Sequence, residues 1–172
     1  MELEQAIRSR RTHKAFGSDP VAPEVLEELL ELARWAPNHN LTNPWSFRVL
    51  GPRTLARLKA LAEEISPGSA SKLDRAPTLV VASVLLTGDD AQQADDLLAT
   101  AVAAYLVLLA AHGRGLASYW RSVPLLDLPA GREALALDPA ERPIGLLHLG
   151  WPRQEQRVPE RAPVAAFVSY LP

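Results

Sequence analysis

Cysteine is absent from this 172-residue chain. Its absence excludes a disulfide framework, thiolate metal ligands and a cysteine nucleophile, and it fits a reducing, cytoplasmic environment. The four histidines, at positions 13, 39, 112 and 148, could still bind a metal, but no two of them stand three or four residues apart. Histidine ligands on one helix need such a spacing. We therefore expect no metal site.

A large net charge and a long apolar run are also lacking. The formal net charge is −2 and the pI is about 6.1, so no overall basic field would attract nucleic acid or an anionic membrane. The N-terminus MELEQAIRSRR lacks the apolar core of a signal peptide, so nothing predicts export. The most apolar stretch, residues 97–111, is shorter than the roughly 20 residues of a membrane span. We expect a helix buried in the core or between subunits.

Common catalytic motifs are missing as well. The chain contains neither a G-x-S-x-G elbow nor a Walker loop. The segment HGRGLAS has two glycines but lacks the third that a dinucleotide-binding fingerprint requires, so it is interpreted as a helix C-cap. If the chain is an enzyme, a bound cofactor would have to supply its chemistry.

The elements that are present predict one α+β domain over residues 1–172, because this length suits a single sizeable core. Helical spacing predicts helices over residues 3–7, 23–36, 55–65 and 91–112, and a short one within 127–137. Apolar runs predict strands over 44–51, 78–86, 116–123 and 144–150. Residues 66–77 are expected to form a flexible loop and residues 152–172 an extended arm. Since helices and strands do not alternate strictly, we predict a three-layer α+β fold.

The segment RSRRTHKAF, residues 8–16, concentrates positive charge at the end of the first helix. If the helix continued, Arg10 and Lys14 would fall within about 40° of the apolar residues Leu3 and Ile7, on the side that should be buried. The helix dipole and solvent explain the outer cations, but an unpaired buried charge is costly. A bound phosphate or similar anion would compensate this charge, and so would an internal carboxylate partner. The spacing favours the two alternatives equally.

Two further segments allow two interpretations each. In APNHNLTNPW, the polar residues Asn38, His39, Asn40 and Asn43 could satisfy their own backbone after a helix stop, or they could contact a ligand. In SYWRS, the aromatic and the arginine could belong to the core and to a surface ion pair. They could equally bind a flat anionic ligand at the end of a strand.

Together these segments resemble the nitroreductase family of flavin-dependent oxidoreductases, and especially its small, minimal members. The resemblance rests on four motifs in the correct order: R-R-T-H-K-A-F at residues 10–16, A-P-N-H-N-L-T-N-P-W at 36–45, W-R-S at 120–122 and L-G-W-P at 149–152. It covers nearly the whole chain. The resemblance implies a central mixed sheet flanked by helices and an intertwined homodimer, with one FMN in each of two pockets at the subunit interface.

The resemblance also implies roles for individual residues. Arg10, Arg11 and Thr12 would bind the FMN phosphate and ribityl chain, and Lys14 would lie near N1 and O2 of the flavin ring. The other subunit would donate residues 35 and 39, and the 120–122 segment would lie against the flavin with its backbone. The implied FMN-binding residues are therefore Arg10, Arg11, Thr12, Lys14, Trp35, His39, Trp120, Arg121 and Ser122.

Two positions depart from the family pattern or match it loosely. Trp35 stands where close minimal relatives carry arginine, so ring packing would replace a polar flavin contact. In the arm, the segment PERAP makes Arg161 a further candidate for the phosphate. His13 has no assigned role.

The implied activity is a ping-pong reduction, in which NAD(P)H gives a hydride to FMN and a nitroaromatic, a quinone or a related small acceptor then takes the electrons. No side chain is required as a catalytic acid or base for the first step. The sequence does not choose between NADH and NADPH. The alternatives are an oxygen-using flavin enzyme of the same fold and a flavin-binding or scaffold dimer without turnover.

Overall fold

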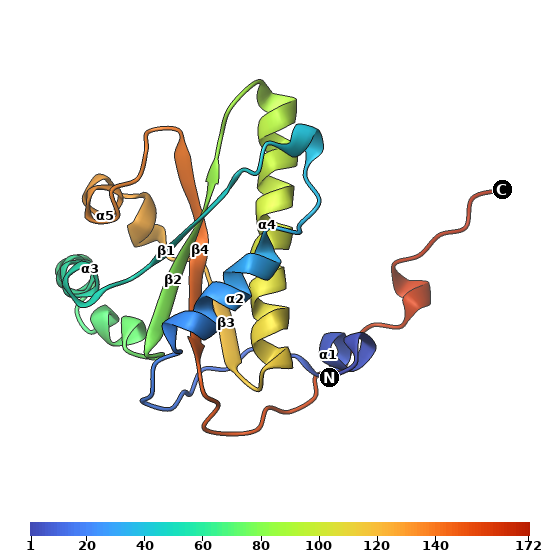
Figure 1. The fold of residues 1–172 in the computed structure, drawn as a ribbon, viewed down its shortest axis with the longest axis horizontal. Coiled ribbons are helices and arrows are strands. Elements are labelled where there is room, and N and C mark those ends of the chain that lie inside the picture. The colour runs from blue at the N-terminus through green and yellow to red at the C-terminus, as the bar shows by residue number, and fades with distance from the viewer.

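A four-stranded sheet forms the middle layer of the computed structural model, which describes residues 1–172 (Figure 1). The strands are β1 (Trp45–Val49), β2 (Thr78–Leu85), β3 (Ala117–Arg121) and β4 (Glu141–Gly150), and their order across the sheet is β1-β2-β4-β3. Every neighbouring pair is antiparallel. The expected mixed sheet is therefore wrong for the four strands.

Helices cover both faces of the sheet, which confirms the three-layer α+β prediction. One face packs against α2 (Pro23–Ala33) and α4 (Asp90–Gly113). The other packs against α3 (Pro52–Ile65) and α5 (Pro129–Ala134), together with the short helices η2 (Ser69–Leu73) and η3 (Pro124–Asp127). The remaining helices are α1 (Leu3–Ser9), η1 (His39–Leu41) and η4 (Val164–Ala166).

The apolar sequence of β2 follows from this double cover. Val80 and Ala82 belong to the core beneath α2 and α4, whereas Leu79 and Val81 belong to the core on the α3 side. A strand buried on both faces has no polar face, so its residues are apolar without alternation.

Helix α4 is longer than the apolar run that predicted it. It spans 24 residues and begins at the side chain of Asp89, which accepts a hydrogen bond of 2.9 Å from the Gln92 backbone N–H. By length and composition alone it could cross a membrane, so the expectation that it is too short is wrong. In this structure small residues such as Ala103, Ala104 and Ala111 pack it into the core against α2 and the sheet, as in the core helix of a globular protein.

The first helix is shorter than a continuous helical projection requires. It ends at Ser9, and Arg10 has an extended conformation with φ −56° and ψ 131°. The projection that placed Arg10 and Lys14 on a buried helix face therefore fails. The apolar side chains Leu3 and Ile7 are 67% and 51% exposed in the single chain.

The two segments outside the main elements behave differently. Residues 66–77 were expected to be flexible with little to bury, but this is wrong because η2 places Leu73 in the core with 2% exposure. The residues after Pro152 do form an arm, which leaves the body of the protein (Figure 1). Its apolar side chains Phe167, Tyr170 and Leu171 are strongly exposed.

Candidate functional site

The cationic segment lies beside edge strand β3. Thr12 forms an isolated parallel bridge with Ser118, and the His13 backbone N–H donates to the Ser118 carbonyl at 3.0 Å. Further along, Phe16 forms an antiparallel bridge with Pro152. The segment after α1 is thus fixed to the sheet by its backbone.

Arg10, Arg11 and Lys14 find no carboxylate within the chain, whereas Arg8 pairs with Glu4. The Arg10 guanidinium carbon lies 5.8 Å from the centre of the Tyr105 ring, and Arg11 donates to the Arg8 carbonyl at 2.7 Å. The buried Nε atoms of Arg10 and Arg11 have no hydrogen-bond partner, and none of the six ion pairs includes these arginines or Lys14. The internal carboxylate that the sequence allowed is absent. These residues therefore fit a phosphate-bearing group, because charged hydrogen bonds would satisfy the guanidinium donors.

Two histidines lie next to these arginines. His112, in the last turn of α4, has its Nε2 atom 2.7 Å from the Ser9 hydroxyl. Burial lowers the pKa of His13, and the neighbouring His112 and Arg10 lower it further. Burial, Arg10 and Arg11 likewise lower the pKa of His112. The lowered pKa values favour the neutral form of both histidines, so the positive charge here comes mainly from the arginines.

The side chain of Trp120 turns away from the open edge of β3. Its indole N–H donates to the Ile144 carbonyl at 3.2 Å, and its ring lies so close to Gly145 that a Cβ atom there would overlap it. The ring belongs to the core on the α2 and α4 side. The Trp120 side chain is half-buried against this core, so its backbone is the part that lies along the open edge.

The other two members of the W-R-S motif differ in exposure. The Nη1 atom of Arg121 is buried and has no partner, whereas Ser122 is exposed. Arg121 therefore carries an unsatisfied donor on the α3 side of the sheet, where the other core lies.

The loop after α2 is held by its own polar residues. Asn38 accepts a hydrogen bond from the Asn43 backbone N–H at 2.9 Å, and the Asn43 side chain donates to the Leu41 carbonyl at 2.7 Å. The Thr42 hydroxyl donates to Asp96, a fully buried carboxylate of α4, at 2.6 Å. These asparagines therefore follow the interpretation in which turn residues satisfy the local backbone.

The same loop is conformationally strained. Asn40, Leu41 and Asn43 have φ angles of 54°, 51° and 48°, which are unfavourable for residues other than glycine. His39 is exposed and its ring forms no hydrogen bond within the chain, and Trp35 is 74% exposed. The strained loop thus presents two unsatisfied aromatic side chains to the outside.

Within one chain, the His39 loop and the cationic segment contact different stretches of α4. The His39 loop lies against residues between Asp95 and Val102, whereas Arg10 lies over the Tyr105 ring and Ser9 contacts His112. Residues 95 and 105 are 10 positions apart, which is about 15 Å along a helix. Figure 1 shows η1 and α1 at opposite ends of α4.

The remaining expectations concern Arg161 and a metal site. Arg161 is exposed on the arm and takes part in no hydrogen bond or ion pair. No group of three or more His, Asp or Glu side chains could hold a metal ion.

The sequence reasoning gave no role to His148. It is fully buried in β4 and stacks on Tyr119 with a ring distance of 5.4 Å. Burial, with smaller contributions from Arg121 and Arg75, lowers its pKa to about 4. Its two-residue spacing from buried Leu146 was the signal that could have placed it on the core face.

Residues 7–151 match the family model described as the nitroreductase family. The match covers most of the chain, and the fold and the uncompensated arginines agree with the resemblance seen in the sequence. The chain belongs to the nitroreductase family.

Individual relatives agree with this assignment over nearly their full length. The chain is 28% identical to the Bacillus subtilis protein named "Putative NAD(P)H nitroreductase YfhC", over 94% of this chain and 90% of that protein. A nitroreductase-like protein from Bacillus cereus shares the fold with a TM-score of 0.90 at 24% identity, over 99% and 96% of the two chains. A Desulfovibrio desulfuricans relative solved in complex with FMN is 25% identical with a TM-score of 0.82, over 100% and 98%.

Proposed function

We propose that this protein is an FMN-dependent oxidoreductase that uses NAD(P)H to reduce nitroaromatics, quinones or related small acceptors. Family membership supports the class of reaction, and the FMN complex of the Desulfovibrio relative supports the cofactor. The observation that carries the proposal is the pair Arg10 and Arg11, whose buried Nε donors lack partners in a segment without carboxylates. A phosphate at this place would satisfy these donors.

FMN, when bound, would accept a hydride from NAD(P)H and deliver two electrons to a second substrate in a ping-pong cycle. The chain's residues would bind and orient it. Arg10, Arg11 and Thr12 would hold the phosphate and ribityl chain, and Lys14 would place a positive charge near N1 and O2. The backbone of residues 120–122 would lie along the ring, since the Trp120 side chain is already used in the core.

We further propose that the working unit is a homodimer in which the partner donates Trp35 and His39. The separation of the His39 loop from Arg10 along α4, about 15 Å between residues 95 and 105, supports this arrangement. The exposed apolar side chains Leu3, Ile7, Leu98 and Val102 and the apolar arm support it as well. Apolar surface of this extent is typical of an interface.

The first experiment is reconstitution with FMN followed by gel filtration. The proposal expects a yellow protein whose flavin is bleached by NAD(P)H without oxygen and is reoxidised by menadione or nitrofurazone. No flavin absorbance in the protein peak would overturn the proposal. Bound FMN without bleaching would instead favour the flavin-binding dimer.

A matched pair of variants tests the phosphate contact. Arg10→Gln should weaken FMN binding by about tenfold or more, since a charged hydrogen bond contributes about 1.5–3 kcal/mol. Arg8→Gln removes the same charge from an exposed pair with Glu4 and should leave FMN affinity unchanged. Equal affinities in the two variants would remove Arg10 from the site.

A further inference from the structure

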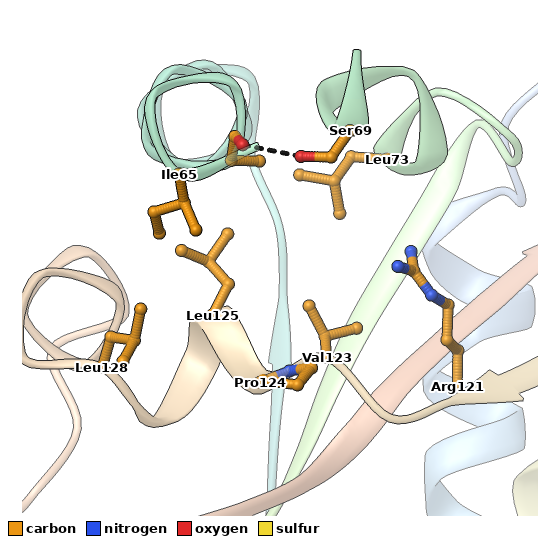
Figure 2. Close-up of a pocket in the computed structure, with 9 residues that line it drawn as sticks. Ile65, Ser69, Leu73, Arg121, Val123, Pro124, Leu125 and Leu128 are labelled. Carbon is orange, nitrogen blue, oxygen red and sulfur yellow. Dashed lines mark hydrogen bonds between the residues drawn. The ribbon is translucent and has the colours of Figure 1, made fainter. Parts of the chain in front are cut away.

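An apolar cavity of about 200 Å³ lies between α3, η2 and η3, beside the end of β3. Its wall is formed mainly by Ile65, Leu73, Val123, Leu125 and Leu128. Figure 2 shows Arg121 on one side of this space, and Ile65, Leu125 and Leu128 gathered on the other. The cavity therefore has an apolar end and a cationic end.

Arg121 is the only ionisable residue in the lining, and no acid neutralises it. Its side chain forms no ion pair or hydrogen bond, and its Nη1 atom is buried without a partner. Arg75 is a second positive charge nearby, since Arg121 and Arg75 both act on His148 as positive charges. An unsatisfied buried donor is costly, and an anion would compensate it.

We propose that this cavity binds small aromatic monocarboxylates, with the carboxylate on the Arg121 guanidinium and the ring against Ile65, Leu125 and Leu128. The size fits, because an apolar cavity of about 150 Å³ accommodates benzene. The single guanidinium matches a carboxylate, which it can bind through two parallel hydrogen bonds.

A dianion such as a phosphate fits this cavity poorly. The lining offers one cation and few other donors to a second negative charge. The Ser69 hydroxyl already donates to the Ala62 carbonyl at 2.6 Å, as the dashed line in Figure 2 marks. The remaining wall is largely apolar, so a doubly charged group would lose hydration without replacement.

The cavity adjoins the segment that we propose lies against FMN, because Arg121 precedes Ser122 and Val123 lines the cavity. The bound acid would then be the electron acceptor, and this part rests on the proposed function. With a nitrobenzoate, each cycle would convert nitro to nitroso and water, using NAD(P)H and one proton. Binding of the acid itself does not depend on turnover.

Binding is tested by calorimetry on the FMN-supplied dimer with benzoate and with benzyl alcohol, a neutral ligand with the same ring. We expect benzoate to bind about tenfold more tightly or better. Arg121→Gln should abolish this preference, and Arg121→Lys should retain part of it. The control Arg53→Gln removes a charge from the exposed start of α3 and should change nothing. Equal binding of the two ligands to the wild type would overturn the proposal.

Two readouts separate this proposal from the proposed function. If Arg121→Gln loses FMN together with benzoate while remaining folded by circular dichroism, Arg121 serves the cofactor and the cavity proposal is wrong. In turnover, the ratio of kcat/KM for 4-nitrobenzoate over its methyl ester should fall about tenfold in Arg121→Gln. A wild type that binds benzoate but never oxidises NAD(P)H would contradict the proposed function and leave the cavity assigned.

Discussion

At the scale of single residues, Lys14 is an exposed cation that takes part in none of the ion pairs of the chain. If it lies near N1 and O2 of FMN, it stabilises the negative charge that reduction adds there. We expect Lys14→Ala to lower the flavin midpoint potential by about 30 mV or more, because about 30 mV equals 1.4 kcal/mol in a two-electron couple. Spectroscopic redox titration measures this shift. An unchanged potential would remove this role from Lys14.

His148 provides a prediction about stability and pH. Its pKa is lowered from 6.5 to about 4, mainly because the ring is buried, and both ring nitrogens lack partners. The unfolded chain therefore binds this proton more tightly than the folded one. The free energy of unfolding should fall as the pH drops from about 6.5 to about 4, by up to about 3 kcal/mol.

His148→Phe tests this effect, since it keeps an aromatic ring against Tyr119 but cannot titrate. The variant should lose less stability than the wild type between pH 7 and pH 5, as measured by urea denaturation at each pH. His13 and His112 titrate in the same direction, so some pH dependence should remain. Parallel losses in the two proteins would contradict the assignment.

The sequence identified Arg10 and Lys14 as cations without an obvious partner, but it predicted their structural position wrongly. The helical projection was wrong, because it assumed a helix that ends at Ser9. The conclusion that these cations need an anion or a carboxylate rested on that projection, and its reason fails for Lys14, which is exposed. For Arg10 the cost of an unpaired buried donor still applies, because its Nε atom is buried without a partner and the chain supplies no carboxylate. Whether Arg10, Lys14, Trp35 and His39 contact FMN stays a prediction.

At the scale of elements, the loop from Asn38 to Asn43 depends on a buried carboxylate. Thr42 donates to Asp96 at 2.6 Å and the Gln92 amide donates to the same oxygen at 3.0 Å. These bonds act against the strain of the positive φ angles in the loop. They hold His39 in one position. We propose that this residue contacts the FMN bound by the partner subunit.

Thr42→Val removes one of these bonds while keeping the shape of the side chain. We expect a loss of about 1–2 kcal/mol in stability and faster hydrogen exchange in residues 38–43, because the buried carboxylate loses a donor. Thr87→Val, at an exposed position, should change neither quantity. Unaltered exchange in the loop of the Thr42 variant would show that the backbone alone holds it.

Elements were predictable where the signal is local. The end of α4 followed from Gly113 and Gly115, and Gly115 has the positive φ of 78° that a C-cap uses. The antiparallel sheet order was not predictable, since β2 pairs with β4 across some sixty residues of sequence. The η2 helix was missed because it has only five residues, follows Pro67 and Gly68, and is anchored by a single leucine, Leu73.

At the scale of the whole molecule, the C-terminal arm exposes apolar side chains that the rest of the single chain does not cover. Val164, Phe167, Tyr170 and Leu171 are all more than half exposed, and apolar side chains gain free energy when they are buried. In the proposed dimer the partner would cover them. Deletion of residues 158–172 should therefore shift the mass in light scattering from dimer toward monomer at micromolar concentration and weaken FMN binding. A full-length monomer would contradict the dimer itself.

The separation of Arg10 and His39 along α4 also predicts complementation between two defective chains. If each site combines Arg10 of one chain with His39 of the other, a chain carrying Arg10→Ala and a chain carrying His39→Ala should complement each other. In a mixed dimer both defects fall in one site and the other site is intact. Random mixing of the two defective proteins should thus restore about a quarter of the wild-type sites, because half of the dimers are mixed and each mixed dimer has one intact site. The two variants, assayed separately and then refolded together, provide the comparison.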